Sequence, residues 1–304
     1  MRLLQSISMK CTIRVGSRGS ALALKQTQIV ADALKAIDPE ITVETQVIQT
    51  QGDINQAPIP LDIVGKGWFT KEIESALLDR SIDLAVHSLK DMAETMPEGL
   101  CIGAYMSRED ARDVLITCDG APLESLKIGA IIGTDSIRRQ IQMRAIRPDV
   151  TMKSIRGNVP TRIEKLKSQE YDAIILAAAG LNRLGLQAHI SQYFTPEEMT
   201  PAPGQGTLAI QMRTDSTEIA KLVAQINDEG AAHCAQIERS FSHAVGGGCK
   251  SPTGAYAYRD GSDCILLTMY AEASGVILRH SHSAAWDTST DLGLKAAQQY
   301  LKSS

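Results

Sequence analysis

The stretch IGAIIGTDSIRR at residues 128–139 repeats the plan of an earlier stretch, TIRVGSRGSAL, at residues 12–22. In each stretch a short apolar run, with a strand expected at 12–15 and at 128–132, ends in a Gly/Ser-rich turn that precedes helical spacing of apolar residues. Ser20 stands where an N-cap of the first helix is expected. Strands that alternate with helices form βαβ units with a mainly parallel sheet. The repeated plan therefore predicts two α/β lobes of about 100 residues each.

Further elements extend both lobes outward from these stretches. Apolar runs or alternation predict strands at 41–48, 82–86, 100–105, 113–117, 151–155 and 172–178 and a return strand at 207–213. Helical spacing predicts helices at about 20–37 and 68–80, one that begins at Ile137 and one that ends near 168. Residues 49–66 contain prolines and glycines without a period, so we expect a long loop, which often serves as a functional lid.

The pattern changes in the last third of the chain. Helices near 216–245 precede strands around 254–259, 264–273 and 276–282 and a final helix, an order that predicts a small α+β domain. The sequence thus predicts three domains. They are a first lobe of residues 1–106 and 207–224, a second lobe of residues 107–206, and a third domain of residues 225–304.

The composition excludes several classes of protein. A chain of 304 residues with 43% apolar content can bury a sizeable core, which excludes a disordered or fibrous protein. Acidic residues exceed basic residues by 35 to 31, so we expect neither nucleic acid nor a membrane as a partner. No apolar run approaches the roughly 18 residues of a membrane span, and the N-terminal segment lacks the apolar region of a signal peptide. Six cysteines without a CxxC pair argue against a disulfide framework and favour a cytoplasmic protein.

Basic side chains recur at the C-terminal ends of the predicted strands and in the turns that follow. This edge of an open α/β sheet binds ligands, and helix N-termini there add donors and positive potential. Arginine holds a carboxylate with two hydrogen bonds and stays charged. One such arginine is as often a solvated surface charge, but the shared position favours a site for several carboxylates or phosphates. The residues are Arg18, Lys90, Arg138, Arg139, Arg156, Arg162 and Arg183.

Two further residues stand out by their neighbours. Asp91 follows an apolar strand beside Lys90, where a carboxylate can face a ligand, although strand-end aspartates more often form caps or turns. Cys249 follows three glycines, which let a large group approach the sulfur, whereas a lone cysteine is ordinarily a small buried apolar residue. His280 and His282 share a strand face without a third ligand nearby, so we expect no metal. Nothing in the sequence beside Lys90 marks a desolvated amine of lowered pKa.

Eight stretches together resemble the porphobilinogen deaminases, also called hydroxymethylbilane synthases. They follow that family's order over about residues 12–260: VGSR at 15–18, KGWFTKE at 66–72, VHSLKD at 86–91, GTDSIRRQ at 133–140, RGN at 156–158, residues 171–180, GQG at 204–206 and GGC at 247–249. The resemblance implies two lobes like type II periplasmic binding proteins, with mixed, mainly parallel sheets, and an α+β third domain. It implies a transferase of tetrapyrrole and haem biosynthesis that condenses four porphobilinogens head to tail into hydroxymethylbilane and releases ammonia.

The resemblance also implies roles by matching position. Cys249 would carry a covalent dipyrromethane primer, and Asp91 would be the acidic catalyst, whose carboxylate can stabilise a cation formed on a pyrrole ring and transfer protons. The implied binders of the primer are Ser88, Lys90, Thr134, Ser136, Arg138, Arg139, Arg156, Gly157 and Arg162. The implied binders of the substrate, porphobilinogen, are Arg18, Ser20, Gln26, Phe69, Arg156 and Arg183. We expect a monomer.

Several positions depart from the family's pattern: Gln51, Asp62, Val64, Asp135 and Thr207. Three of the changes make the site less positive or more negative, so we expect weaker affinity for an anionic substrate. Asp91, Cys249 and the main arginines are present, which favours the enzyme. The alternative is a non-catalytic carboxylate- or tetrapyrrole-binding protein of the same fold. A solute-binding protein for a transporter is disfavoured because no signal peptide is recognisable.

Overall fold

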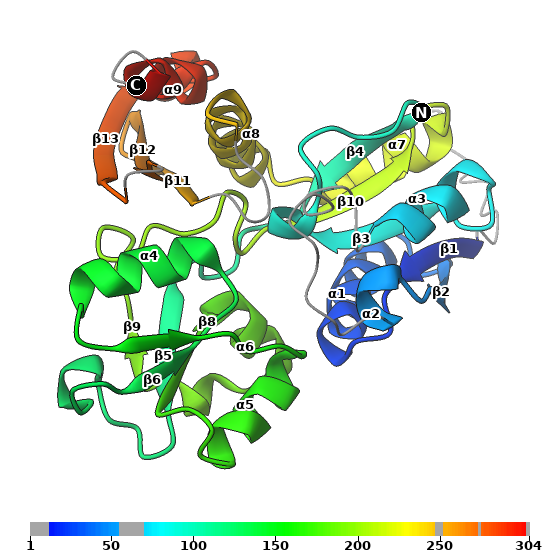
Figure 1. Cartoon of the computed structure of the whole chain (residues 1–304). Helices are drawn as coiled ribbons and strands as arrows, with labels where there is room; N and C mark the ends of the chain where they lie inside the picture. Colours follow the sequence, from blue (N-terminus) through cyan, green and yellow to red (C-terminus); the bar gives the residue numbers. More distant parts are fainter. Residues whose placement is uncertain (1–11, 55–69, 247–251, 273–274, 302–304) are drawn as a thin grey trace, which may run out of the picture.

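Three β-sheets organise the described part of the chain (Figure 1). The computed structural model describes residues 12–54, 70–246, 252–272 and 275–301. The first and second sheets have five strands each and the third has three. Figure 1 shows the second sheet with its helices as a green lobe and the third sheet, in orange, beside the red helix at the end of the described chain.

The first sheet has the strand order β2-β1-β3-β10-β4. Its strands are β1 (Thr12–Ser17), β2 (Thr42–Val47), β3 (Leu84–Ser88), β4 (Leu100–Tyr105) and β10 (Leu208–Arg213). β1 pairs in parallel with β2 and β3, whereas β10 is antiparallel to both of its neighbours. The return strand predicted at 207–213 therefore crosses back into this sheet. The helical elements of this part are α1 (Ala21–Ile37), α2 (Gln51–Ile54), α3 (Lys71–Leu78), η1 (Leu89–Asp91), α7 (Thr217–Val223) and η4 (Ala224–Ile226).

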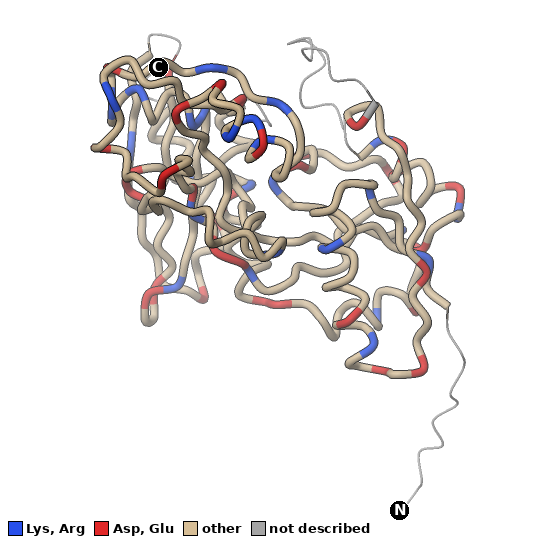
Figure 2. Tube along the Cα trace, turned by 90° about the horizontal axis from the view of Figure 1, so that it is seen from below, with Lys and Arg blue, Asp and Glu red and all other residues tan. Residues whose placement is uncertain are grey.

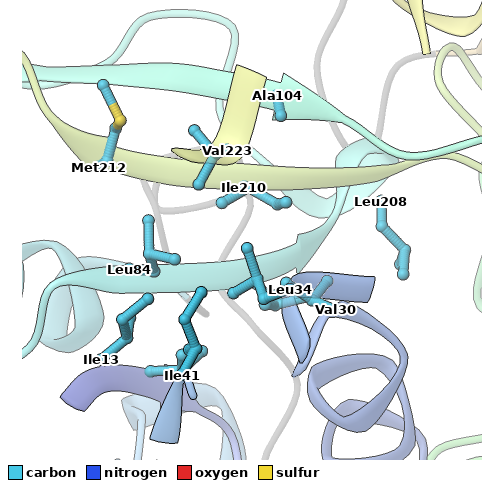
Figure 3. Close-up of a cluster of buried hydrophobic side chains, with 12 residues drawn as sticks. Ile13, Val30, Leu34, Ile41, Leu84, Ala104, Leu208, Ile210, Met212 and Val223 are labelled. Carbon is cyan, nitrogen blue, oxygen red and sulfur yellow. The ribbon is translucent and has the colours of Figure 1, made fainter. Parts of the chain in front are cut away.

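Alternation along β3 separates two apolar layers. Leu84 and Val86 pack with side chains of α1 and α7, and Ala85 between them packs on the opposite face with α3. Figure 3 shows side chains of β1, β3, β10, α1 and α7 gathered in the first of these layers. Each fully buried Leu or Ile there contributes about 1.5–3 kcal/mol to folding. A Cβ at Gly16 in β1 would lie 2.4 Å from Ile82 Cδ1, so a larger residue here would force the buried Ile82 side chain to move.

The second sheet repeats this plan in the order β7-β6-β8-β5-β9. Its strands are β5 (Asp113–Thr117), β6 (Ile131–Gly133), β7 (Thr151–Lys153), β8 (Ala173–Ala177) and β9 (Gln192–Tyr193). β5 is antiparallel to both neighbours and occupies the place that β10 holds in the first sheet. The helical elements here are η2 (Leu123–Ser125), α4 (Ile137–Ile146), α5 (Val159–Lys167), α6 (Ala178–Leu184) and η3 (Gln187–His189). Helices α5 and α6 cover one face of this sheet and α4 the other.

The third sheet is antiparallel, in the order β11-β12-β13. It consists of β11 (Thr253–Asp260), β12 (Asp263–Ala271) and β13 (Ile277–Ala285). It packs against α8 (Glu229–Ala244) and α9 (Leu292–Leu301), with η5 (Trp286–Thr288) between β13 and α9. The fold class is confirmed: two α/β lobes with mixed sheets are joined to a small α+β unit. The domain boundaries stay predictions.

Two predicted elements were placed wrongly. The strand expected at 128–132 begins at Ile131, because Gly129 forms a turn with φ of +78° that leaves Ile128 86% exposed. Part of the long loop expected at 49–66 is helical, since α2 occupies residues 51–54, while residues 55–66 lie outside the described residues. The N-cap prediction is confirmed, because Ser20 Oγ accepts a hydrogen bond from the Ala23 amide at 3.3 Å.

Candidate active site

The Gly/Ser-rich turns use several of the predicted ligand-binding hydroxyls for local bonds. Ser20 caps α1, and Ser136 caps α4 by accepting a hydrogen bond from the Arg139 amide at 3.4 Å. Thr134 Oγ1 accepts a bond from the Ser136 amide at 3.2 Å and is buried. These contacts hold the first turn of α4 at the end of β6, which directs its two arginines toward β5.

Arg138 and Arg139 both bind Asp113, the first residue of β5. Arg138 Nη1 lies 2.7 Å from Asp113 Oδ2, and Arg139 donates to Asp113 Oδ1 from Nε at 3.0 Å and Nη2 at 2.7 Å. The two guanidiniums also donate to the backbone oxygens of Thr200 and Ile175. All three charged side chains are buried. Burial alone would raise the pKa of Asp113, but the two arginines hold this pKa well below its usual range.

Gln205 joins this cluster to Lys90. Its Nε2 donates to Asp113 Oδ1 at 2.9 Å and to the Ala111 carbonyl at 2.6 Å, while its Oε1 accepts from Lys90 Nζ at 3.3 Å. The pKa of Lys90 is lowered to about 8, chiefly by burial; Arg139 also lowers this pKa, whereas Asp91 and Asp113 raise it. Lys90 is thus a desolvated amine, contrary to what its neighbours in the sequence indicated, because the folded chain buries it.

Asp91 ends η1 with an exposed side chain. Its charge acts on Lys90 in its own lobe and on Arg162, which α5 of the other lobe carries. Burial lowers the pKa of Arg162, Arg139 and Arg156 lower it further, and Asp135 and Asp91 oppose this. The structure therefore brings together, from both lobes, much of the predicted set: Lys90, Asp91, Arg138, Arg139, Arg156 and Arg162.

Two predicted substrate binders form ion pairs with carboxylates of this chain. Arg18 Nη2 lies 2.5 Å from Asp53 Oδ1, at the end of α2. Arg156 Nε lies 3.4 Å from Asp135 Oδ2, and Ser154 donates to the other oxygen of Asp135. Asp135, one of the departures from the family's pattern, thus partly neutralises Arg156.

The remaining predicted residues occupy varied places. Gln26 Nε2 donates to Ser88 Oγ at 2.8 Å, which links α1 to the end of β3. Arg183 Nη2 donates to the Gly206 carbonyl at 2.6 Å, and burial lowers the pKa of Arg183 to about 10. Gly157 has φ of +115°, a value that favours glycine, and its carbonyl accepts a bond from Arg162 Nε at 2.7 Å.

Some sequence predictions fall on residues that the structure does not describe. Cys249, Phe69, Asp62 and Val64 lie outside the described residues. Conversely, Asp113, Asp53 and Gln205 contact predicted site residues although none of the three was predicted to belong to the site. A charge at the start of the apolar strand Val114–Thr117 was a usable signal for Asp113.

Neither a metal centre nor a membrane-spanning helix is found in the described parts of the chain. No group of three His, Cys, Asp or Glu side chains there is placed to hold a metal ion. The His280 and His282 rings lie 5.9 Å apart, and His282 Nε2 is within 3.1 Å of Thr268 Oγ1. Across the same residues, every helix is too short or too polar to cross a bilayer. Figure 2 shows basic and acidic residues interspersed along the trace.

Proteins of a known family are similar to this chain in sequence. The family model described as porphobilinogen deaminase, dipyromethane cofactor binding domain, matches residues 13–221. Curated porphobilinogen deaminases are 44% identical over 287 residues in Oceanobacillus iheyensis (94% of this chain, 93% of the relative) and 46% identical over 269 residues in Bacillus subtilis (88% and 86%). Among solved structures, the methionine binding protein MetQ is 12% identical with a TM-score of 0.45, covering 75% of this chain and 96% of its own. The chain belongs to the porphobilinogen deaminase family, transferases that use a dipyrromethane cofactor and polymerise porphobilinogen in tetrapyrrole biosynthesis.

Proposed function

We propose that the chain condenses four porphobilinogens head to tail into hydroxymethylbilane, on a dipyrromethane primer bound covalently to Cys249, and releases one ammonia per ring. The observation that carries this proposal is the set of desolvated cations around Asp91. Lys90 from one lobe and Arg162 from the other both have a pKa lowered by burial, and Asp91 acts on both.

The donor set fits the proposed primer. Each pyrrole ring of substrate or primer carries an acetate and a propionate, so two linked rings present four carboxylates. Burial disfavours the charged form of a cation because it removes water from it. A bound anion stabilises that charged form in place of the lost water. We propose that Lys90, Arg139, Arg156 and Arg162 hold the primer carboxylates, with Arg138 fixed beside them through Asp113. When bound, the primer supplies the pyrrole carbon to which the first substrate ring is joined.

The residues of the chain would act in three ways. Arg18 and Arg183 bind the substrate carboxylates. Gln26 donates to Ser88 and so keeps the Ser88 side chain in place. The exposed Asp91 carboxylate accepts hydrogen bonds from pyrrole N–H groups and stabilises the cation that remains on the substrate when the protonated amino group of its aminomethyl substituent leaves as ammonia and the methylene carbon stays on the ring. After the new carbon–carbon bond has formed, the same carboxylate takes the proton from the attacking carbon and restores the aromatic ring.

Asp135 and Asp53 would lower the affinity for substrate. Each carboxylate pairs with an arginine that the proposal assigns to ligand binding, Arg156 and Arg18 respectively. An incoming carboxylate must compete with them, which supports the expectation of weaker affinity. We further propose a monomer in the cytoplasm, which is consistent with the free thiols of Cys101, Cys118, Cys234 and Cys264.

Intact mass measurement tests the proposal. The native chain should exceed its sequence mass by two linked pyrrole units, and Cys249→Ser should lack this increment because a hydroxyl is a much poorer nucleophile than a thiolate. Addition of porphobilinogen should give species heavier by successive single rings under denaturing conditions. Cys264→Ser, at a buried cysteine, is the matched control and should keep the increment.

Two other outcomes have distinct meanings. An unmodified Cys249 and no series of heavier species, even after reconstitution, would overturn the deaminase proposal in favour of a binding protein. An increment that never extends would support the primer and contradict turnover.

A further inference from the structure

Helix α8 of the third unit holds the segment that follows Asp91. Ser242 Oγ donates to Glu94 Oε1 at 2.7 Å, and His243 Nδ1 lies 3.2 Å from Glu94 Oε2. Arg239, one helical turn earlier, donates from Nη2 to the Ala93 carbonyl at 2.7 Å and to the Glu94 carbonyl at 3.3 Å. Both carboxylate oxygens of Glu94 and two backbone carbonyls thus bind one end of α8.

Apolar side chains also join the segment around Asp91 to α8. Leu89, which begins η1, and Met92, which follows it, are 0% and 3% exposed and pack with Ala235 of α8. The turn itself is short, since η1 comprises three residues and closes with a bond from the Met92 amide to the Leu89 carbonyl at 3.1 Å. A single 3₁₀ turn has poor hydrogen-bond geometry and little stability of its own. The place of the exposed Asp91 carboxylate therefore depends on the anchors on either side of the turn.

The Glu94 carboxylate lies where it needs hydrogen-bond donors, at the C-terminal end of α8. The C-terminal end of a helix carries partial negative charge, which repels a carboxylate. Glu94 can stay there because Ser242 and His243 present donors to its two oxygens. The Glu94 side chain is 19% exposed, so part of its hydration has been replaced by these contacts. A substitution that loses them leaves the backbone contacts with Arg239 as the remaining polar link between this segment and α8 among the described residues.

We propose that Glu94 is a positioning residue that holds the Asp91 turn against α8 through Ser242 and His243, and so sets where the Asp91 carboxylate meets the reacting ring. This inference rests on the catalytic role proposed for Asp91. Glu94 touches no reacting atom. It affects the rate because it fixes the position of the turn that carries Asp91.

Steady-state kinetics and hydrogen exchange on the full-length, primer-loaded protein test this inference. Glu94→Ala should lower kcat by about tenfold to a hundredfold, because a displacement of about 1 Å can cost a hundredfold in rate, and KM should stay within about twofold. Exchange of the amides in residues 89–96 should accelerate. Glu94→Gln keeps an oxygen acceptor for Ser242 and should restore most of kcat. Glu98→Ala, at an exposed glutamate of the same loop, is the matched control and should match the parent protein.

Asp91→Asn, alone and together with Glu94→Ala, shows whether a failure lies in the positioning role of Glu94 or in the catalytic role proposed for Asp91. If Asp91→Asn leaves kcat unchanged, the catalytic role of Asp91 is wrong. If Asp91→Asn abolishes most turnover while Glu94→Ala changes neither kcat nor the exchange of residues 89–96, the positioning role alone is wrong. If Glu94→Ala lowers kcat in the Asp91→Asn background as much as in the parent, Glu94 does not act through Asp91, and the inference is overturned.

Discussion

His87 and Lys90 stand three positions apart, and burial lowers the pKa of both side chains. The pKa of His87 falls to about 4, so its bond with Gln211 at 3.0 Å is that of a neutral imidazole at pH 7. The pKa of Lys90 falls to about 8, which leaves most of the amine protonated at pH 7. Of these two residues, Lys90 can therefore bind a carboxylate by charge at neutral pH, whereas His87 cannot.

The lowered pKa of Lys90 predicts how substrate affinity depends on pH. Lys90 is charged below about pH 8 and loses its charge as the pH rises through that value. Lys90 is proposed to bind the primer, but its charge also adds to the field that attracts the substrate carboxylates. This attraction is present at pH 7 and weakens toward pH 9, so KM should rise over this interval. In Lys90→Arg the charge persists to much higher pH, and the rise should be smaller. The measurement is KM at half-unit steps from pH 6.5 to 9.5.

Lys71→Arg provides the control, because Lys71 is an exposed lysine outside the cluster. It should leave the pH profile of KM unchanged. The same rise in Lys90→Arg as in the parent would mean that Lys90 does not contribute charge to substrate binding.

Helix α4 shows how one element serves stability and ligand binding together. Its first turn supplies Arg138 and Arg139, which reach the buried Asp113 of β5. Hydrogen bonds to charged groups contribute about 1.5–3 kcal/mol each, and a buried charge that loses its partner costs more than the bond is worth. The two arginines are therefore structural partners of Asp113, whatever they also bind.

Substitution of these arginines should affect both properties. We expect Arg138→Leu and Arg139→Leu each to lower the free energy of unfolding by about 3–5 kcal/mol, because each change also leaves the buried Asp113 with one cation fewer. The larger loss is expected for Arg139, which donates twice to Asp113. Primer loading, measured by intact mass, should also fall. Arg144→Leu changes an exposed arginine of the same helix and should leave both properties unchanged.

The pair of measurements distinguishes the two roles. Lost stability with full primer loading would make both residues purely structural and contradict their predicted role as primer binders. Lost loading with unchanged urea unfolding would mean that the contacts with Asp113 contribute no net stability.

Buried polar side chains link the three sheets at the scale of the whole molecule. Gln205 lies in the segment that returns from the second sheet to the first, and it joins Lys90 to Asp113. Glu238 of α8 accepts from Arg108 Nη1 at 2.6 Å, from the Gly204 amide at 2.6 Å and from the Ala257 amide at 2.7 Å. The side chains of Gln205 and Glu238 are fully buried. The returning segment is thus held from both lobes and from the third unit.

Removal of the Gln205 link should loosen this junction. Gln205→Ala leaves the Ala111 carbonyl and Asp113 each with one donor fewer, and an unsatisfied buried group costs about 1–3 kcal/mol. We expect a lower Tm in a thermal melt, while Gln187→Ala, at an exposed position, should melt like the parent. Equal melting temperatures for both variants would contradict a stabilising role for the link.

The features that could be predicted correctly from the sequence are local or carried by motifs: the alternation of strands and helices, the Ser20 cap, the two-lobe α/β class and the family. These features follow from periodicity and from contacts between near neighbours, which a sequence displays directly. The tertiary structure alone decided that Asp113 pairs with Arg138 and Arg139, that Gln205 reaches Lys90, and that Asp135 pairs with Arg156. The roles of Asp91 and Cys249 stay predictions of the motifs. Burial and charge act through space between segments that are far apart in the chain. The pKa of Lys90 and the partners of the arginines therefore depend on the folded structure and could not be predicted from the sequence.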